Sequence, residues 1–402
     1  MTAHPALLTG STALHFTKSP PTPAAVWLLM TVVGVVGSNS LALGPIAPDI
    51  AHDLGASITA TLRASAAFGL GTAISALLLA RYIDHKGARF VLSCAVTVLT
   101  LSFAICTIAP NVVVLGSGQL FAGLAAGVAL PACYTSAAII APEKQESRVL
   151  GLVLIGWTVS LVFGVSLSAL ISDSFHWRAV YMTLAVLSAT AFIRVTRSNI
   201  PNRTSLKNAS TPLTAFKVPG VPYLLFVVAC YMTAFYGVYN FVGDHIVEAL
   251  SYSVKANAWI AISYGTGFGL ATLLDPMLDR LTNAPGSSTR FRLPNIALTC
   301  LAVVYLVLAI ASDSYPALVI SAGLWGMFNH LGLNILIAAL NATDSKQRGA
   351  IIGLYSCITY LCLAIGTVGY GVIYEASSFI VLCITSTGMC LVAVAAGMVK
   401  RS

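Results

Sequence analysis

The sequence predicts an all-α membrane protein with twelve transmembrane helices in two pseudo-symmetric six-helix bundles. Three observations support this prediction. Charged residues make up only 8% of the 402 residues, while 57% are hydrophobic; soluble domains carry about a quarter charged residues. The charges fall in short clusters between apolar runs, and each run approaches the roughly 20 residues that a spanning helix needs. A polar central segment divides the runs six and six.

The apolar runs are continuous, which excludes the strands of a membrane barrel because those alternate over about 10 residues. Residues 1–24 contain Pro20, Pro21 and Pro23 and no short apolar core ending at a cleavage site, so they are expected to form a cytoplasmic tail and not a signal peptide. The predicted spans are 25–47, 62–83, 90–110, 113–139, 149–171, 178–197, 221–243, 257–277, 293–312, 316–341, 349–372 and 377–399.

The spans divide into an N-terminal bundle, residues 25–197, and a C-terminal bundle, residues 221–399, joined by a cytoplasmic central loop, residues 198–220. The halves carry similar segments at equivalent loops. Ala-Pro-Glu-Lys-Gln-Glu-Ser-Arg ends at Arg148, and Ala-Thr-Asp-Ser-Lys-Gln-Arg ends at Arg348. A repeated six-helix half is typical of secondary transporters, whose substrate site lies between the halves near the membrane midplane.

The distribution of basic residues predicts the orientation. Eighteen of the 21 Lys and Arg residues fall in the tails and in one set of loops, and only Arg63, Arg178 and Lys255 fall in the other set. Loops rich in Lys and Arg stay on the cytoplasmic side. Both termini are therefore expected in the cytoplasm, with the chain in the cytoplasmic (inner) membrane. The net charge of +8 follows from this topology and does not indicate a nucleic-acid partner.

The loop between the second and third predicted spans carries a sequence motif. The segment Ala-Arg-Tyr-Ile-Asp-His-Lys-Gly-Ala-Arg, residues 80–89, resembles the loop signature G-x-x-x-D-R-x-G-R-R of major facilitator superfamily transporters. In that superfamily the loop latches one half to the other on the cytoplasmic side. The resemblance implies a major facilitator fold and a conformational latch made by the three matching residues, Asp84, Gly87 and Arg89. Ala80, His85 and Ala88 depart from the signature.

The fifth span resembles the twelve-span drug and sugar efflux branch of the superfamily. That branch has G-P-x-x-G-G followed by G-W-R, and Gly164, Trp177 and Arg178 match. Small residues at Gly156, Ser160, Gly164 and Ser168 line one helix face, which allows close helix packing. In the fourth span, Gln119 stands where such exporters often have the arginine tied to proton coupling. The resemblance implies an efflux transporter related to drug:proton antiporters.

Polar residues within the spans are candidates for function, since burying them in hydrocarbon is costly. His330 lies near the middle of the tenth span, with Asn329 and Asn334 close in sequence. A histidine changes charge near neutral pH, which suits proton coupling or substrate binding; the alternative is a structural hydrogen bond. Asp275, near the cytoplasmic end of the eighth span, is a coupling acid or, by the favoured interpretation, an interfacial partner of Arg280.

Aromatic residues mark a candidate substrate cavity. Tyr231, Phe235 and Tyr239 repeat at helical spacing in the seventh span, which suits a pocket for a planar or amphipathic solute as well as plain helix packing. Asn39 in the first span is expected to contact the cavity, and Trp157 and Tyr134 are candidate wall residues. The acids expected at solvated outer loop ends are Asp49, Asp53, Asp244 and Glu248.

The chain has no phosphate-binding Gly-Lys-Ser/Thr loop and no His-Glu-x-x-His helix, so we expect no enzyme, no catalytic residues, no cofactor and no metal. The function expected is secondary active transport of a small organic solute, as proton-coupled efflux, by a monomer in the lipid bilayer. Two alternatives stay open: uptake of a small organic molecule or anion, and a transporter-like receptor or assembly factor without flux.

Overall fold

A computed structural model describes residues 24–79, 81–142, 145–202, 212–278, 289–344 and 347–399, and within these ranges the regular structure is entirely helical. Six spans form the N-terminal bundle. The fifth of them is α6 and α7 joined by a π-helical turn, Ser160–Gly164. The bounds are α1 (Ala24–Leu54), α2 (Ile58–Leu78), α4 (Ala88–Thr107), α5 (Val112–Ile140), α6 (Glu146–Val159), α7 (Val165–Ser174) and α8 (Trp177–Arg197).

The C-terminal bundle contains the other six spans. Two short helices lie outside the spans: α3 (Tyr82–Lys86), between α2 and α4, and the 3-10 turn Pro212–Lys217, before α9. The bounds are α9 (Val221–Asp244), continued by a π-helical segment (His245–Ala249), α10 (Ala256–Ala271), α12 (Thr289–Ile310), α13 (Tyr315–Asn341), α14 (Arg348–Ala376) and α15 (Phe379–Val399).

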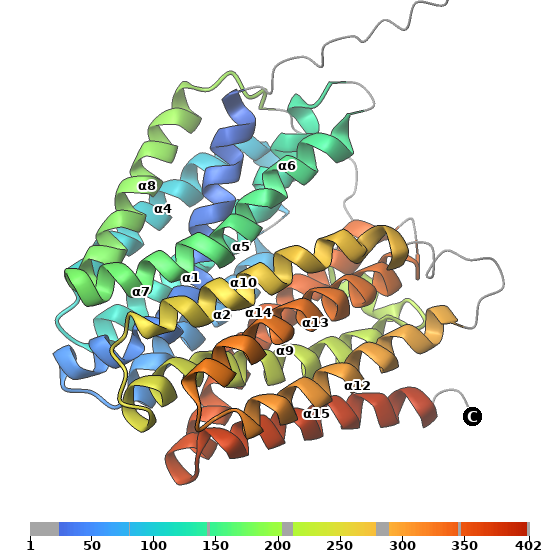
Figure 1. Ribbon diagram of the computed structural model, residues 1–402. Helices are drawn as coiled ribbons and strands as arrows, with labels where there is room; N and C mark the ends of the chain where they lie inside the picture. Colours follow the sequence, from blue (N-terminus) through green and yellow to red (C-terminus); the bar gives the residue numbers. More distant parts are fainter. Residues whose placement is uncertain are drawn as a thin grey trace, which may run out of the picture.

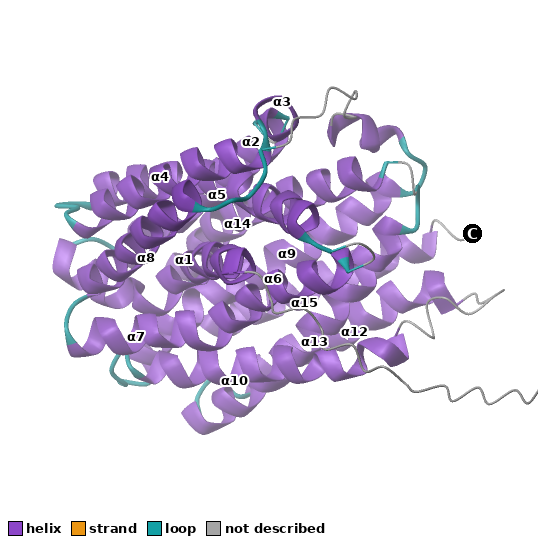
Figure 2. Cartoon of the chain, turned by 90° about the horizontal axis from the view of Figure 1, so that it is seen from above, coloured by secondary structure: helices purple, strands orange, loops and turns teal. Residues whose placement is uncertain are grey.

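The two bundles lie side by side with their long helices packed across a common interface. In Figure 1, α4 and α8 form one flank of the molecule and α12 and α15 the opposite flank, with the remaining long helices between them. The view from above in Figure 2 again places α1, α9 and α14 in the middle. The bundles touch through α2 against α14, α1 against α9, and α7 against α10.

Eleven helices in the described part of the chain are long and apolar enough to cross a membrane. The remaining predicted span begins with α10, which ends at Ala271 and is followed by the 3-10 turn Thr272–Leu274. Pro276 explains the break, because proline removes a helical N–H and its ring crowds the carbonyl four residues earlier. The helical conformation resumes at 275–278, so α10 and its continuation fill the place of the eighth span.

Several span boundaries differ from the sequence prediction. The second helix begins at Ile58, not residue 62, because Ser57 caps it by accepting a hydrogen bond from the Ala60 N–H at 3.1 Å. Arg63, which suggested the boundary, is an exposed residue on the helix. The first helix runs seven residues beyond the predicted end, to Leu54, and in this extension Asp49 and Asp53 hydrogen-bond to Ser172 and Trp177 of neighbouring helices.

The two ends of the molecule differ. The basic end is the end at which α2 finishes and α4, α6 and α14 begin; it carries Arg81, Lys86, Arg89, Arg148 and Arg348. At the closed end, opposite, the bundles are in direct contact. There the Asn257 side chain donates a hydrogen bond to the Pro45 carbonyl oxygen at 2.8 Å, joining α10 to α1, and the Thr59 hydroxyl on α2 donates one to the Glu375 carboxylate on α14.

Glycines set the spacing of the helices within the N-terminal bundle. A Cβ added at Gly164 would lie 1.9 Å from the Ser38 hydroxyl oxygen, and one added at Gly156 would lie 2.3 Å from the Met30 carbonyl oxygen. Both contacts are far below van der Waals distance, so α1 and the α6–α7 span approach as closely as they do only because these positions lack side chains.

Candidate functional site

A cavity of about 940 Å³ lies between the two bundles. It opens at the basic end, where its lining includes Arg81, Asp84, Pro212 and Gly349, and it reaches Leu41 near the middle of α1. No residue of the closed-end turns lines it among the described parts of the chain. The structure is therefore open at the basic end and closed at the other.

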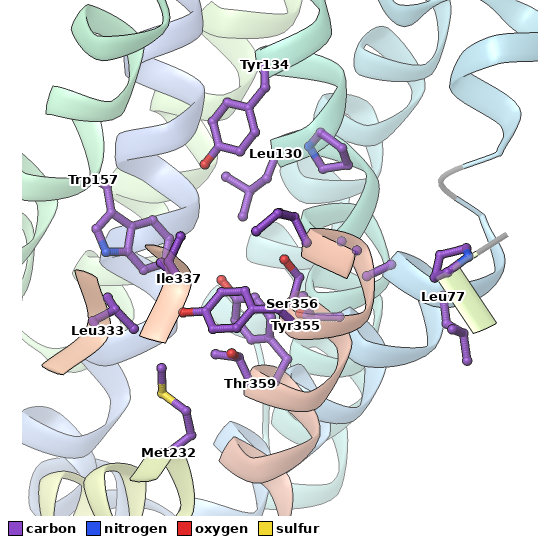
Figure 3. A pocket seen from close by; sticks show the side chains of 18 of the residues that line it. Leu77, Leu130, Tyr134, Trp157, Met232, Leu333, Ile337, Tyr355, Ser356 and Thr359 are labelled. Atoms are coloured by element: carbon purple, nitrogen blue, oxygen red, sulfur yellow. The ribbon is translucent and has the colours of Figure 1, made fainter. Parts of the chain in front are cut away.

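Both bundles contribute to the cavity wall. Figure 3 shows Tyr134 and Trp157, from α5 and α6, on one side of the space, and Tyr355, Ser356 and Thr359 of α14 across from them. The flanking helices α4, α8, α12 and α15 contribute none of the described lining residues. A site shared between bundles changes shape when they move relative to each other, which is the requirement for alternating access.

An aromatic cluster forms the deep wall on the C-terminal side. Phe235 of α9 stacks on Tyr264 of α10 with ring centroids 5.8 Å apart, and it lies 5.5 Å from Trp325 of α13 and 4.9 Å from Tyr236. Tyr264 and Trp325 meet edge to face at 5.3 Å. Rings packed at these distances hold one another in place, so the cavity presents a rigid aromatic surface.

Asn329 joins this wall to the helices behind it. The Tyr231 hydroxyl donates to the Asn329 side-chain oxygen at 2.5 Å and also lies 2.6 Å from its backbone carbonyl, and the Asn329 amide donates to the Tyr264 hydroxyl. Since the Tyr264 oxygen accepts this bond, its own proton is left to donate. Asn329 and Tyr264 both line the cavity.

The structure brings only some of the sequence-predicted candidates to the cavity. Tyr231 and Tyr239 are buried in the packing of α9, at 1% and 3% exposure, because on a central helix the aromatic stripe also faces neighbouring helices. His330 and Asn334 lie in α13 outside the lining. The candidates that line the cavity are Phe235, Asn329, Trp157 and Tyr134.

Asn39 does not contact the cavity in this structure, contrary to expectation. Its amide donates to the Gln119 side-chain oxygen at 3.0 Å, and the Gln119 amide donates back to Asn39 at 3.1 Å and lies 3.7 Å from the Cys106 sulfur. Two primary amides pair reciprocally, so each satisfies the other inside the bundle. Gln119, which replaces the exporter arginine, therefore ties α5 to α1 as a neutral group.

His330 pairs with Asp275, for which the sequence favoured Arg280 as the partner. Its Nε2 lies 3.0 Å and 3.2 Å from the two carboxylate oxygens of Asp275, and the Asn334 amide donates to Asp275 at 2.7 Å. These three residues are named here the α10–α13 cluster. Arg280, the expected partner of Asp275, lies outside the described residues. His330 also packs edge-on against Phe268, with ring centroids 4.7 Å apart.

The loop after α2 is bound within its own bundle. Gly87 has φ +88°, and a Cβ there would lie 2.1 Å from the Asn202 side chain, so both its conformation and its space require glycine. Arg89 donates to the Thr196 carbonyl oxygen at 2.7 Å. Asp84 lines the cavity mouth and forms no hydrogen bond or ion pair with any other residue in the described part of the chain.

Of the four acids expected at solvated outer loop ends, Asp53 and Glu248 are exposed, Asp49 is half-buried and Asp244 is buried. Asp53 forms an ion pair with Arg178 at 2.5 Å and accepts the Trp177 indole N–H at 3.0 Å, which explains the Trp-Arg pair found in the sequence. Asp244 is 6% exposed and accepts a hydrogen bond from the Tyr374 hydroxyl at 2.8 Å. Asp49 accepts one from the Ser172 hydroxyl. These contacts join helices far apart in sequence, so residue spacing did not reveal them.

The described side chains include no group of three or more His, Cys, Asp or Glu residues placed to hold a metal ion. The cavity wall is instead made of rings, hydroxyls and amides. This chemistry suits reversible binding of an organic solute.

Comparisons with known proteins agree with this architecture. The chain is 26% identical over 366 residues to "Uncharacterized MFS-type transporter YwfA" of Bacillus subtilis (strain 168), covering 89% of this chain and 87% of that protein. It is 25% identical over 267 residues to "Chloramphenicol resistance protein" of Streptomyces lividans, covering 64% and 67%.

The fold is also similar to that of the nucleoside transporter NupG, with a TM-score of 0.73, 14% sequence identity and coverage of 94% of this chain and 98% of that one. The model of the family described as "Major Facilitator Superfamily" matches residues 26–367. Apolar helical spans in two bundles around a cavity open at one end, together with this match, lead to one conclusion: the chain belongs to the Major Facilitator Superfamily and is an integral membrane transporter of small solutes.

Proposed function

We propose that the protein is a proton-coupled exporter of a small, uncharged organic solute with an aromatic or similarly planar ring, working as a monomer in the cytoplasmic membrane. The basic end faces the cytoplasm in this proposal, because Lys and Arg concentrate there. The structure is then the state that loads solute from the cytoplasm. Phe235, Trp157 and Asn329 contact the solute, while Tyr231 and Tyr239 support the wall from behind.

The observation that carries the proposal is the uncharged inner lining of the cavity. Of the described lining residues, only Arg81 and Asp84 carry a charge, and both lie at the mouth. A charged solute held deeper would lose its hydration without gaining a counter-charge, which costs several kcal/mol. A neutral ring can stack on the aromatic wall and exchange hydrogen bonds with the hydroxyls of Tyr264, Ser356 and Tyr355.

Export is favoured over uptake by two further observations. The Gly164, Trp177 and Arg178 matches resemble the efflux branch, and one similar protein is a chloramphenicol resistance protein. Chloramphenicol is itself a neutral aromatic solute with hydroxyl groups, so it suits the lining. It is the first probe to test, with the nucleoside uridine as a second neutral probe.

Transport in proteoliposomes tests the proposal. Vesicles with an acidic lumen should accumulate labelled chloramphenicol or uridine as protons leave, whereas benzoate, an aromatic anion, should not exchange. Accumulation only with an acidic exterior would indicate proton-coupled uptake instead. If no solute of a broad neutral and anionic panel exchanges across the membrane, a receptor without flux becomes the better explanation.

The aromatic wall gives a matched pair of variants. Trp157→Ala removes a ring that lines the cavity, and stacked rings contribute about 0.5–1.5 kcal/mol, so solute affinity should fall roughly 2- to 12-fold. Trp259→Ala removes a tryptophan that is 61% exposed and outside the lining, and it should leave affinity unchanged. Equal effects of both substitutions would contradict binding at this wall.

A further inference from the structure

A partly buried acid–base pair lies next to the cavity without lining it. The carboxylate of Asp275, directly after the 3-10 turn that follows α10, meets the imidazole of His330 in the middle of α13 at 3.0 Å. The side chains are 30% and 13% exposed, respectively. Asn334 adds a hydrogen bond to the same carboxylate at 2.7 Å. We infer that this α10–α13 cluster binds the proton that drives transport, an inference that rests on the proposed function.

The cluster lies about two helical turns from the basic end of α13. The helices α10 and α13 run in the same direction, since the Tyr315 hydroxyl bonds the Ala256 carbonyl and Phe268 packs on His330. Asp275 therefore sits level with Asn334, seven residues before the end of α13 at Asn341. At 1.5 Å per residue this places Asp275 about 10 Å from that end. The sequence favoured an interfacial pairing of Asp275 with Arg280, which lies outside the described residues.

Among the described side chains, no other carboxylate, imidazole, amine or guanidinium contacts the pair. Asp275 is the only acid, and the described Lys and Arg residues form no ion pair with it. The helices packed around α13 bring tyrosine hydroxyls, and no carboxylate or amine, to this part of the bundle among the described residues. These tyrosines are Tyr231 from α9, Tyr264 from α10, Tyr305 from α12 and Tyr355 from α14.

The hydrogen bonds define where a proton can be added. A carboxylate only accepts, so Nε2 of His330 must carry a hydrogen when it bonds ionised Asp275. The other ring nitrogen, Nδ1, is buried and has no hydrogen-bond partner in the described structure. In the neutral ring this atom holds a free lone pair. A proton that binds there turns the pair from net −1 to net zero, with the charge shared between ring and carboxylate.

The pair is only partly exposed, and Nδ1 of His330 is buried. Within the described residues, Asn334 is the one further side chain that hydrogen-bonds the pair. Losing the proton again requires access to water. The cluster can therefore exchange its proton in one conformation and retain it in another, which is what a coupling site must do.

The cluster also contacts residues that line the cavity. Phe268 lines the cavity with one face and meets the His330 ring edge-on with its other side, at 4.7 Å. Asn329, next to His330 in the chain, belongs to the hydrogen-bond network of the aromatic wall. A shift of His330 between its two charge states would move both neighbours. Solute and proton would then be coupled without sharing the same atoms.

Transport assays in proteoliposomes distinguish a loss of proton coupling from a loss of solute transport. With the membrane potential clamped at zero, a one-unit pH gradient coupled one to one sustains about a tenfold concentration ratio, because one pH unit and a tenfold ratio are equal in free energy. His330→Gln and Asp275→Asn should keep chloramphenicol counterflow in the absence of a gradient but lose this tenfold accumulation. Accumulation equal to the parent in both variants would overturn the inference.

Matched controls exist at the closed end. His245 is a buried histidine, bonded through Nε2 to the Ser312 carbonyl at 2.8 Å, and Asp244 is a buried acid. His245→Gln and Asp244→Asn should retain the pH-driven accumulation. If they lose it as fully as the cluster variants, the effect reflects general damage and the assignment fails. Melting temperatures show which variants fold. If His330→Gln does not fold, Asp275→Asn, which keeps the shape of the side chain, tests the site.

A substrate-free measurement keeps the two proposals distinguishable. Spin labels at Phe175 and Ser378, exposed on opposite bundles at the closed end, should report a distance change as pH crosses the range of roughly 5 to 8 in which histidines titrate. His330→Gln should abolish that transition and His245→Gln should not. A transition present in the parent without any solute flux would leave the proton site standing and remove the proposed exporter function. A transition that survives in His330→Gln would remove the proton site.

Discussion

The hydrogen bond from Asn257 to Pro45 should set how long the closed end stays closed. It joins α10 of one bundle to α1 of the other at 2.8 Å and must break when that end opens. Asn257→Ala removes it. A net hydrogen bond contributes about 0.5–1.5 kcal/mol, and each 1.4 kcal/mol is a factor of ten. The population open at the closed end should therefore rise roughly 2- to 12-fold relative to the parent.

Distance measurements between spin labels at Phe175 and Ser378 test this shift directly, because the two positions separate when the closed end opens. Ser386→Ala is the matched control: it removes a side-chain hydrogen bond to the Ala234 carbonyl at 3.2 Å within the C-terminal bundle, which both states retain. If Asn257→Ala gives the parental distance distribution while remaining folded, the bond does not discriminate between the states and the reasoning is refuted.

Three further predictions follow from contacts elsewhere. Gly164→Ala places a Cβ 1.9 Å from the Ser38 hydroxyl and should cost about 1–3 kcal/mol through overpacking, seen as a lower melting temperature that Ser38→Gly partly restores; an unchanged melting temperature would argue against tight packing there. Arg178→Gln and Asp53→Asn should each lower stability. Because the ion pair is about one-third exposed, a double-mutant cycle should give a coupling energy of about 0.5–1 kcal/mol. Fully additive losses would mean that the pair contributes nothing. Asp84→Asn should slow solute exchange and enrich the state open at the basic end, measured by cysteine accessibility from both sides; unchanged rates and accessibility would rule out a latch.

The sequence was sufficient to predict a helical membrane fold in which eleven of the twelve predicted spans are long apolar helices, because span length and charge clustering are local properties of the chain. It also identified Gly164 and Gly156, since small residues repeated at helical spacing have few roles other than packing. The break after α10 was missed. Pro276 was visible in the sequence, but a proline in a transmembrane helix can be accommodated without a break, so its effect depends on neighbouring helices.

Contacts between distant residues account for the remaining errors. Central helices are apolar on nearly every side, so residue pattern does not reveal which face meets the cavity; Phe235 lines it, while Tyr231 and Tyr239 on the same stripe do not. Asn39 was expected to contact the cavity because it is a polar residue within an apolar span. Its partner is Gln119, 80 positions away, and no spacing rule connects them.

The two bundles differ in their capacity for proton chemistry, and this asymmetry constrains the mechanism. At Gln119, where similar exporters often carry an arginine, the N-terminal bundle has a neutral amide. Gln119 and Asn39 hydrogen-bond to each other, and neither side chain ionises. Its acids and bases lie at the two ends of the spans, such as Asp53 at the closed end and Asp84 at the basic end. The C-terminal bundle carries the His330–Asp275 pair inside its helices. If transport is proton-coupled, this pair can carry the charge change, whereas the neutral Asn39–Gln119 pair cannot.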